Sequence, residues 1–150
     1  MNKVSIVIPA FNEQDNLLEL HNEITETLKN QVFYEIIFVN DGSTDKSEEV
    51  LQTLSKYKEV KIIKHEKNYG QSKSIYTGIK FSNFDNIVTL DGDRQNDPKD
   101  IIKLLKIFFS NNYSLVSGIR FKRKDSLIKV ISSKLANNLR SFILKDNCQD

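Results

Sequence analysis

Residues 86–95 read NIVTLDGDRQ, in which an apolar run ends at two carboxylates, Asp91 and Asp93, on either side of Gly92. The run predicts a buried strand over residues 86–90. Carboxylates this close repel each other unless a cation lies between them, and oxygen ligands of this kind suit Mg²⁺ or Mn²⁺. The alternative is a solvated turn, because Asp and Gly are ordinary turn residues. The motifs elsewhere in the chain favour the metal site.

Short β-branched runs alternate along the chain with amphipathic stretches. The predicted strands cover residues 4–8, 35–39, 60–63, 86–90 and 113–118. Apolar residues at helical spacing predict a first helix through Leu17 and Leu28, further helices after Asp45, Gly70 and Pro98, and a last one over about 126–144. This order predicts an α/β fold with a mostly parallel sheet and helices on both faces.

Polar motifs follow three of these strands. PAFNE at 9–13 follows the first, NDGSTD at 40–45 the second and DGDRQ at 91–95 the fourth. Each motif alone is also explained by turns and helix caps. In a parallel sheet, however, ligands bind at the carboxyl ends of strands, near a switch in strand order. We therefore expect the three motifs to meet in one ligand site, where a carboxylate of the second can hydrogen-bond a nucleobase or ribose.

The composition narrows the classes of function. The 150 residues, 39% hydrophobic and 28% charged, indicate one globular domain. A single cysteine, Cys148, predicts no internal disulfide and a reducing compartment. We find no secretory leader and no run of about 20 apolar residues, so we expect a cytoplasmic protein that at most lies on a membrane surface. Neither GxxxxGK[ST] nor GxGxxG occurs. His21 and His65 lack metal-ligand spacing, and His21 is predicted to be a solvated surface residue.

Charge is distributed unevenly along the chain. Residues 118–150 carry eight Lys/Arg and three Asp/Glu, whereas the first 117 residues carry fourteen and seventeen. Arg120, Lys122, Arg123 and Lys124 cluster directly after the predicted fifth strand. The helix expected after them is either packed on the core or lies at an interface with anionic lipid. An anionic partner is expected for this tail, and the nearly balanced net charge argues against nucleic acid.

Taken together, the motifs resemble glycosyltransferase family 2, whose GT-A fold is a Rossmann-like nucleotide-sugar-binding fold. PAFNE is similar to the first-strand motif of the family, VNDGSTD to its second-strand motif and KNYGQSKSIYTG to its Asn-x-Gly segment. LDGDRQNDP resembles the Asp-x-Asp metal motif in its Asp-x-Asp-x-Gln-x-x-Pro form. This form, with SGIRFKR after it, is similar to the branch of polyprenyl-phosphate glycosyltransferases that includes dolichyl-phosphate mannosyltransferase.

The resemblance implies a role for individual residues. Those expected to bind the nucleotide-sugar are Pro9, Ala10, Phe11, Asn12, Glu13, Asn40, Asp41, Gly42, Asn68, Gly70, Lys73, Asp91 and Gly92. Asp93 and Gln95 would coordinate Mg²⁺ or Mn²⁺, and Arg120 and Arg123 would hold the acceptor phosphate. Asp91, Asp93 and Arg120 are the residues assigned to catalysis. Within the branch, Arg94 and Gly92 stand where a hydrophobic residue and Ala are commoner.

The implied activity is a metal-dependent, inverting transfer of a sugar from a UDP- or GDP-linked donor to a polyprenyl phosphate at the cytoplasmic face of a membrane. Residues 1–150 are expected to form one catalytic domain whose nucleotide-sugar part is complete and whose acceptor part is incomplete, because the chain stops at Asp150. No oligomeric state is implied. Two alternatives remain open: a nucleotide-sugar-binding remnant without transfer activity, and a nucleotidyltransferase, whose basic loop after the first strand is missing.

Overall fold

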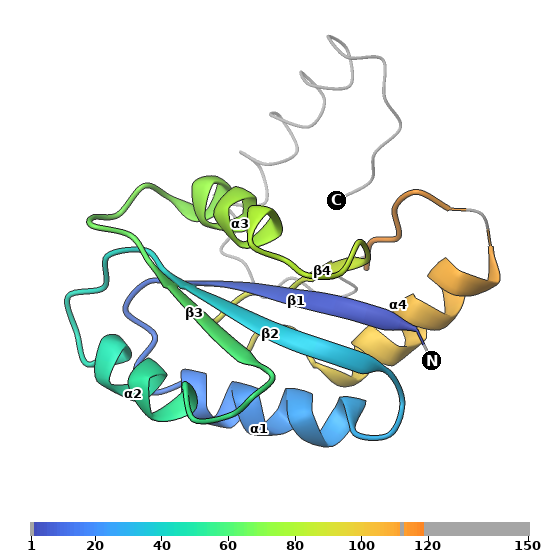
Figure 1. The fold of residues 1–150 in the computed structure, drawn as a ribbon, viewed down its shortest axis with the longest axis horizontal. Coiled ribbons are helices and arrows are strands. Elements are labelled where there is room, and N and C mark those ends of the chain that lie inside the picture. Colours follow the sequence, from blue (N-terminus) through green and yellow to red (C-terminus); the bar gives the residue numbers. More distant parts are fainter. Residues whose placement is uncertain (1, 112, 119–150) are drawn as a thin grey trace, which may run out of the picture. The chain divides into compact units, whose positions relative to one another are not determined.

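The computed structural model describes residues 2–111 and 113–118, in which strands and helices alternate (Figure 1). The strands are β1 (Lys3–Ala10), β2 (Phe33–Asn40), β3 (Val60–Lys64) and β4 (Ile87–Thr89). The helices are α1 (Leu17–Leu28), α2 (Ser47–Leu54), α3 (Gln71–Lys80) and α4 (Lys99–Ser110). The contacts divide the chain after Ile107, so the sheet and the site described below belong to the first unit.

The four strands form one parallel sheet in the order β3-β2-β1-β4. β1 pairs with β2 along its whole length, from Lys3 opposite Phe33 to Ala10 opposite Asn40. The chain proceeds from β1 through β2 to β3 in one direction and then crosses to the other side of β1 to form β4. The strand order therefore reverses between β1 and β4, which is where ligands bind in sheets of this type. The predicted parallel sheet is confirmed.

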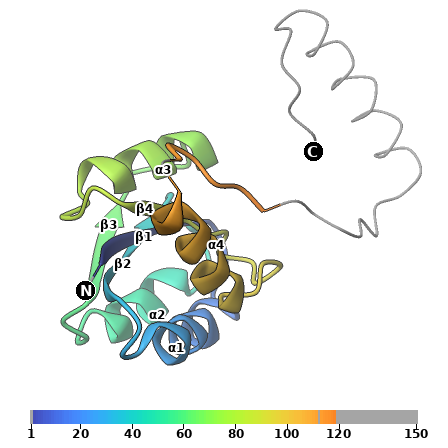
Figure 2. The ribbon, with the colours of Figure 1, turned by 90° about the vertical axis from the view of Figure 1, so that its right-hand side faces the viewer.

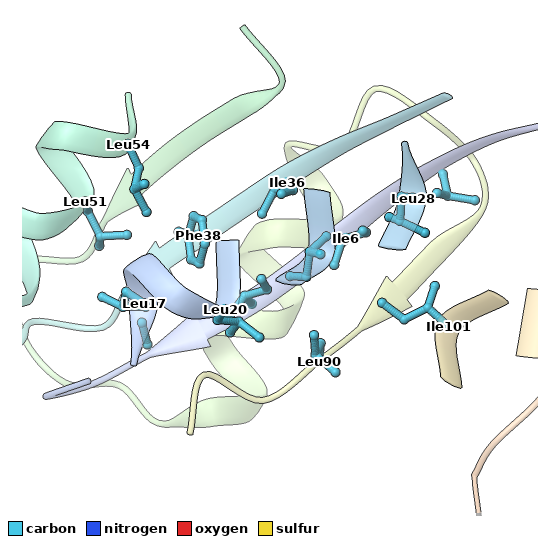
Figure 3. Packing of buried hydrophobic residues seen from close by; sticks show 14 of the residues in the cluster. Ile6, Leu17, Leu20, Leu28, Ile36, Phe38, Leu51, Leu54, Leu90 and Ile101 are labelled. Carbon is cyan, nitrogen blue, oxygen red and sulfur yellow. The ribbon is translucent and has the colours of Figure 1, made fainter. Parts of the chain in front are cut away.

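Helices cover both faces of the sheet, as the alternation predicted (Figures 1 and 2). The even-numbered residues of β1, such as Ile6, face α1 and α2, and the first turns of α4 complete this layer through Ile101 and Leu105. Figure 3 shows Ile6, Leu20 and Phe38 in this core, where all three are fully buried. The burial of these large apolar side chains is the main contribution to the stability of the unit.

The opposite face of the sheet packs on α3 through β-branched residues of the strands and Gly78 of the helix. Val7, Ile37 and Val39 are fully buried there. Gly78 lies over them so closely that a Cβ atom at this position would stand 2.3 Å from the Cγ1 atom of Val7. This close approach brings the N-terminal part of α3, with Gly70 and Gln71, to the carboxyl edge of the sheet.

Two sequence predictions are wrong within the described residues. Residues 113–118 form no strand, and Leu115 is 82% exposed, so its apolar surface gains no packing that would hold a strand in place. His21 is 2% exposed rather than solvated, and its ring stacks on Tyr57 with centroids 4.5 Å apart. It follows Leu17 by one helical turn and so shares the buried face of α1. The helix expected over 126–144 lies outside the described residues.

Across residues 2–111 and 113–118, none of the helices combines the length and the apolar character that crossing a bilayer requires.

Candidate functional site

A cleft of about 350 Å³ opens at the carboxyl edge of the sheet, between the ends of β1, β2 and β4. Its lining residues come from the segments that follow these strands and from the start of α3. They are Pro9, Ala10, Phe11, Glu13, Asp41, Asn68, Gly70, Gln71, Ser74, Asp91, Gly92 and Asp93. The cleft lies where the strand order reverses, so the topology and the predicted motifs agree on its place.

Asp41 is the buried carboxylate of the cleft, with 3% of its surface exposed. Its Oδ1 atom accepts hydrogen bonds from His65 Nδ1 at 2.7 Å and from the backbone N–H of Tyr69 at 3.0 Å, and its Oδ2 atom accepts the N–H of Gly70 at 2.7 Å. Burial alone would raise the pKa of Asp41, but these bonds, aided by Ser74, hold it below its ordinary value of 3.8. Asp41 is therefore ionised at neutral pH and fixed at the N-terminus of α3.

The loops after β1 and β2 are tied together beside the cleft. Asn12, whose φ of 58° is left-handed, accepts the N–H of Thr44 at 2.8 Å through its side-chain oxygen and donates its own N–H to Ser43 Oγ at 3.0 Å. Glu13 donates its N–H to Ser47 Oγ at 2.9 Å. These bonds place the Glu13 side chain at the cleft, while Asn12 faces the neighbouring loop.

The two carboxylates of the DGD motif have different surroundings. Asp91 accepts Gln71 Nε2 at 2.7 Å on one oxygen and Asn96 Nδ2 at 3.3 Å on the other. Asp93 accepts the N–H of Gln95 at 3.0 Å on Oδ1. Within the described residues, hydrogen bonds thus engage both oxygens of Asp91 and one oxygen of Asp93. Asp93 is accordingly the carboxylate with more free acceptor capacity at the cleft.

Gly92 allows this motif to lie against the end of β1. A Cβ atom at Gly92 would stand 3.0 Å from the backbone oxygen of Pro9 and 3.5 Å from Glu13 Cγ. A larger residue is accommodated only if that backbone gives way. The close contact holds the DGD turn next to the first-strand motif.

The loop that carries Asp93 is anchored from outside the cleft by Arg94. The φ of Arg94 is 58°, a left-handed value that costs a side-chain-bearing residue energy. Its guanidinium group pairs with Glu19 and, at 2.6 Å, with Glu23 on α1. These two ion pairs offset the backbone strain and fix the direction in which the loop leaves Asp93.

A divalent cation fits the chemistry of this cleft. In the part of the chain that the structure describes, its lining includes four carboxylates, from Glu13, Asp41, Asp91 and Asp93, and no Lys or Arg. No group of three or more His, Cys, Asp or Glu side chains in the described part of the chain is arranged as a metal site by itself. Mg²⁺ commonly takes one or two protein carboxylates and completes its shell with substrate phosphates and water. Asp93, which has one oxygen without a hydrogen bond from the described residues, suits such a shared site.

The cleft gathers most of the residues predicted to bind the nucleotide-sugar, but not all of them. Asn12, Asn40, Gly42 and Lys73 lie outside its lining, and so does Gln95, which was predicted to be a metal ligand. Asn40 is buried and accepts the N–H of Ser43, and Gly42, at a φ of 70°, packs on the backbone of Lys67 and Asn68. Lys73 lies over the ring of Tyr76 on the exposed side of α3, and the Gln95 side chain is exposed. Arg120 and Arg123 fall outside the described residues.

Three residues of the site were missed at the level of sequence. Gln71 and Ser74 line the cleft, and His65 supports Asp41. Gln71 and Ser74 belong to the first turns of the helix after Gly70, which the strand-end rule places at the same edge of the sheet. Their place at the start of this helix was the sequence signal that could have identified Gln71 and Ser74. No local pattern pairs His65 with a residue 24 positions earlier.

Known proteins were compared with the chain by sequence. The family described as Glycosyl transferase family 2 matches residues 5–149. Undecaprenyl-phosphate 4-deoxy-4-formamido-L-arabinose transferases of Photorhabdus laumondii and Yersinia pestis are both 39% identical over 140 residues, or 91% of this chain. The chain spans 43% and 42% of the length of these relatives, respectively.

Solved structures were compared with the fold. Mannosyltransferase PcManGT from Pyrobaculum calidifontis, in complex with GDP-Man and Mn²⁺, matches with a TM-score of 0.61 at 18% identity, over 69% of this chain and 31% of that one. S. aureus TarS 1-349 in complex with UDP-GlcNAc matches with a TM-score of 0.60 at 22% identity, over 83% and 37%. At these identities the likeness shows the fold, which is the one found in GT-A glycosyltransferases. The family match covers nearly all of the sequence, so the chain belongs to glycosyl transferase family 2.

Proposed function

We propose that this chain acts in a metal-dependent, inverting transfer of a sugar from a UDP- or GDP-linked donor to a polyprenyl phosphate. The observation that carries the proposal is the charge of the cleft: among the described residues, four carboxylates line it and no Lys or Arg does. These carboxylates repel a nucleoside diphosphate, and a divalent cation bound between them would offset that repulsion. The relatives named above act on undecaprenyl phosphate according to their names, which supports the lipid acceptor.

In this proposal the donor lies across the carboxyl ends of β1 and β2, with Asp41 beside the base or ribose and Asp93 at the diphosphate. A bound Mg²⁺ or Mn²⁺ would neutralise charge that develops on the nucleoside diphosphate when the sugar leaves. Gln71 and Asn96 hold the Asp91 carboxylate in place, so that it faces the donor in one orientation. The predicted second metal ligand, Gln95, would need to turn its exposed side chain toward the cleft.

The acceptor explains why no general base is required. A polyprenyl phosphate is anionic near neutral pH and can attack the anomeric carbon without losing a proton, unlike a hydroxyl group. The acceptor phosphate requires positive charge beside it and a fixed orientation. We assign both roles to Arg120 and Arg123 in the basic tail. A lipid acceptor would place the reaction at the cytoplasmic face of a membrane, with the protein bound at its surface.

The first test is calorimetric titration of UDP, GDP, UDP-glucose and GDP-mannose into the chain, with Mn²⁺ and with EDTA. We expect one nucleotide series to bind in Mn²⁺ and to lose its binding in EDTA and in Asp93→Asn. Asp85→Asn is the matched control, because Asp85 is exposed, lies before β4 and is absent from the cleft lining. If neither nucleotide binds to a folded wild-type chain, the proposed function is wrong.

A second test separates transfer from binding alone. The chain is incubated with the donor that binds, carrying a radiolabelled sugar, and with vesicles that contain undecaprenyl phosphate. Label in the lipid fraction supports the transferase. Binding without lipid labelling would leave a nucleotide-sugar-binding protein, and release of pyrophosphate from a nucleoside triphosphate would indicate a nucleotidyltransferase instead.

A further inference from the structure

His65 joins three elements of the fold beside the cleft. It follows β3 directly, and its side chain is only 10% exposed. The Nδ1 atom lies 2.7 Å from Asp41 Oδ1, and the Nε2 atom lies 3.0 Å from the Thr77 hydroxyl on α3. Its backbone N–H is also held, by the carbonyl of Asn40 at 2.9 Å. Both ring nitrogens therefore have a partner, and the imidazole cannot rotate without losing one of them.

The hydrogen bonds define what His65 does for Asp41. The Nδ1–H group donates to the carboxylate whether or not the ring carries a second proton, because the carboxylate can only accept. Thr77 meets either state, since its hydroxyl can donate to Nε2 or accept from it. Thr77 thus orients the ring, and the ring orients the carboxylate.

Asp41 in turn connects this pair to the wall of the cleft. Besides His65, its carboxylate accepts the N–H groups of Tyr69 and Gly70, which directly precede α3. A carboxylate has about four acceptor positions, so most of its capacity is committed to the protein. The part that remains can meet a ligand only in the orientation that these donors impose.

We propose that His65 is a positioning residue of the donor site, which acts on nucleotide affinity through Asp41 and does not touch the ligand. His65 is not among the residues that line the cleft, whereas Asp41 is. Removing the imidazole would leave Asp41 buried but free to turn about its side-chain bonds. This inference rests on the proposed nucleotide-sugar site. The experiment below distinguishes failure of the role of His65 from failure of the site itself.

Two substitutions of His65 separate the effects of its two side-chain hydrogen bonds. In His65→Asn the side-chain N–H₂ can occupy the place of Nδ1, so the bond to Asp41 is retained and that to Thr77 is lost. In His65→Gln the amide reaches the place of Nε2, so the bond to Thr77 is retained and that to Asp41 is lost. Both variants lose the same imidazole ring and replace it with a side-chain amide. Each is therefore a control for the loss of ring packing in the other.

The measurement is the Kd of the nucleotide that binds the wild-type chain with Mn²⁺, together with the thermal unfolding midpoint of each variant. We expect His65→Gln to weaken binding about tenfold, the effect of one hydrogen bond to a charged group. His65→Asn should stay within about threefold of wild type, because it keeps that bond. Thr77→Val should also stay within about threefold of wild type, because it loses the same bond as His65→Asn and keeps the bond from His65 to Asp41.

The outcomes distinguish three cases. Weaker binding in His65→Gln than in His65→Asn, at similar unfolding midpoints, supports positioning through Asp41. Equal affinities in the two variants, whether retained or lost, overturn it and leave His65 a packing residue. Failure of the folded wild-type chain to bind any nucleotide overturns the proposed donor site itself.

Discussion

Gly78 controls how closely α3 approaches the sheet, and replacing it with Ala tests that contact directly. The added Cβ would lie 2.3 Å from Val7 Cγ1, 3.2 Å from Val7 Cγ2 and 3.3 Å from Val39 Cγ2. Ordinary contacts between carbon atoms begin at about 3.5 Å, so the overlap with the first of these atoms is about 1 Å. Val side chains have few alternative rotamers, and both of these are fully buried. We therefore expect the helix to shift.

Two opposing terms set the magnitude. Overpacking a core typically costs about 1–3 kcal/mol. Ala is a better helix former than Gly by about 1 kcal/mol. Because two stiff side chains surround the new methyl group, the cost should lie at the upper end, for a net destabilisation of about 2 kcal/mol. Tyr76→Ala and Tyr76→Gly, at an exposed position of α3, measure the helix-propensity term separately.

Urea unfolding of a double-mutant cycle provides the assay. Val7→Ala alone removes two buried methyl groups and should cost about 2 kcal/mol. Combined with Gly78→Ala, the new methyl occupies the vacated space, so the double variant should be at least about 1 kcal/mol more stable than the sum of the singles implies. Additivity within about 0.5 kcal/mol, at unchanged denaturant slopes, would refute the contact as the reason for glycine at this position.

Two further predictions concern the site. The pKa of Asp41 is below 3.8 in the folded chain, so its carboxylate stabilises the fold above that pH and the contribution is lost as pH falls through the folded pKa. The gap in unfolding temperature between wild type and Asp41→Asn should therefore be wider at pH 7 than at pH 3, and a constant gap would contradict this. Arg94→Ala removes both ion pairs to α1 and disfavours the left-handed φ, whereas Arg94→Gly removes the pairs but adopts that φ freely. Calorimetry should show weaker Mn²⁺-dependent nucleotide binding in Arg94→Ala than in Arg94→Gly, and equal affinities would rule out the loop conformation as the cause.

The sequence predicted the elements that depend on local pattern. The β-branched runs at 4–8 and 35–39 lie within β1 and β2, which extend to Lys3–Ala10 and Phe33–Asn40 because pairing continues past the apolar residues. The run at 86–90 contains the shorter β4, Ile87–Thr89. YSLVSG at 113–118 has a similar local pattern and forms no strand. A strand also needs a neighbour to accept its hydrogen bonds, and no local pattern supplies one.

The sequence by itself determined that the polar motifs would gather at one edge, because parallel strands end on the same side and three motifs follow strand ends. Only the tertiary structure decided which side chains meet there. The order β3-β2-β1-β4 brings Gln71 to Asp91 and His65 to Asp41, across 20 and 24 residues of chain. Arg94 reaches Glu19 and Glu23 across an even longer separation. Periodicity records which face of its own element a residue occupies, whereas these contacts depend on which elements become neighbours, and that is settled by packing the whole unit.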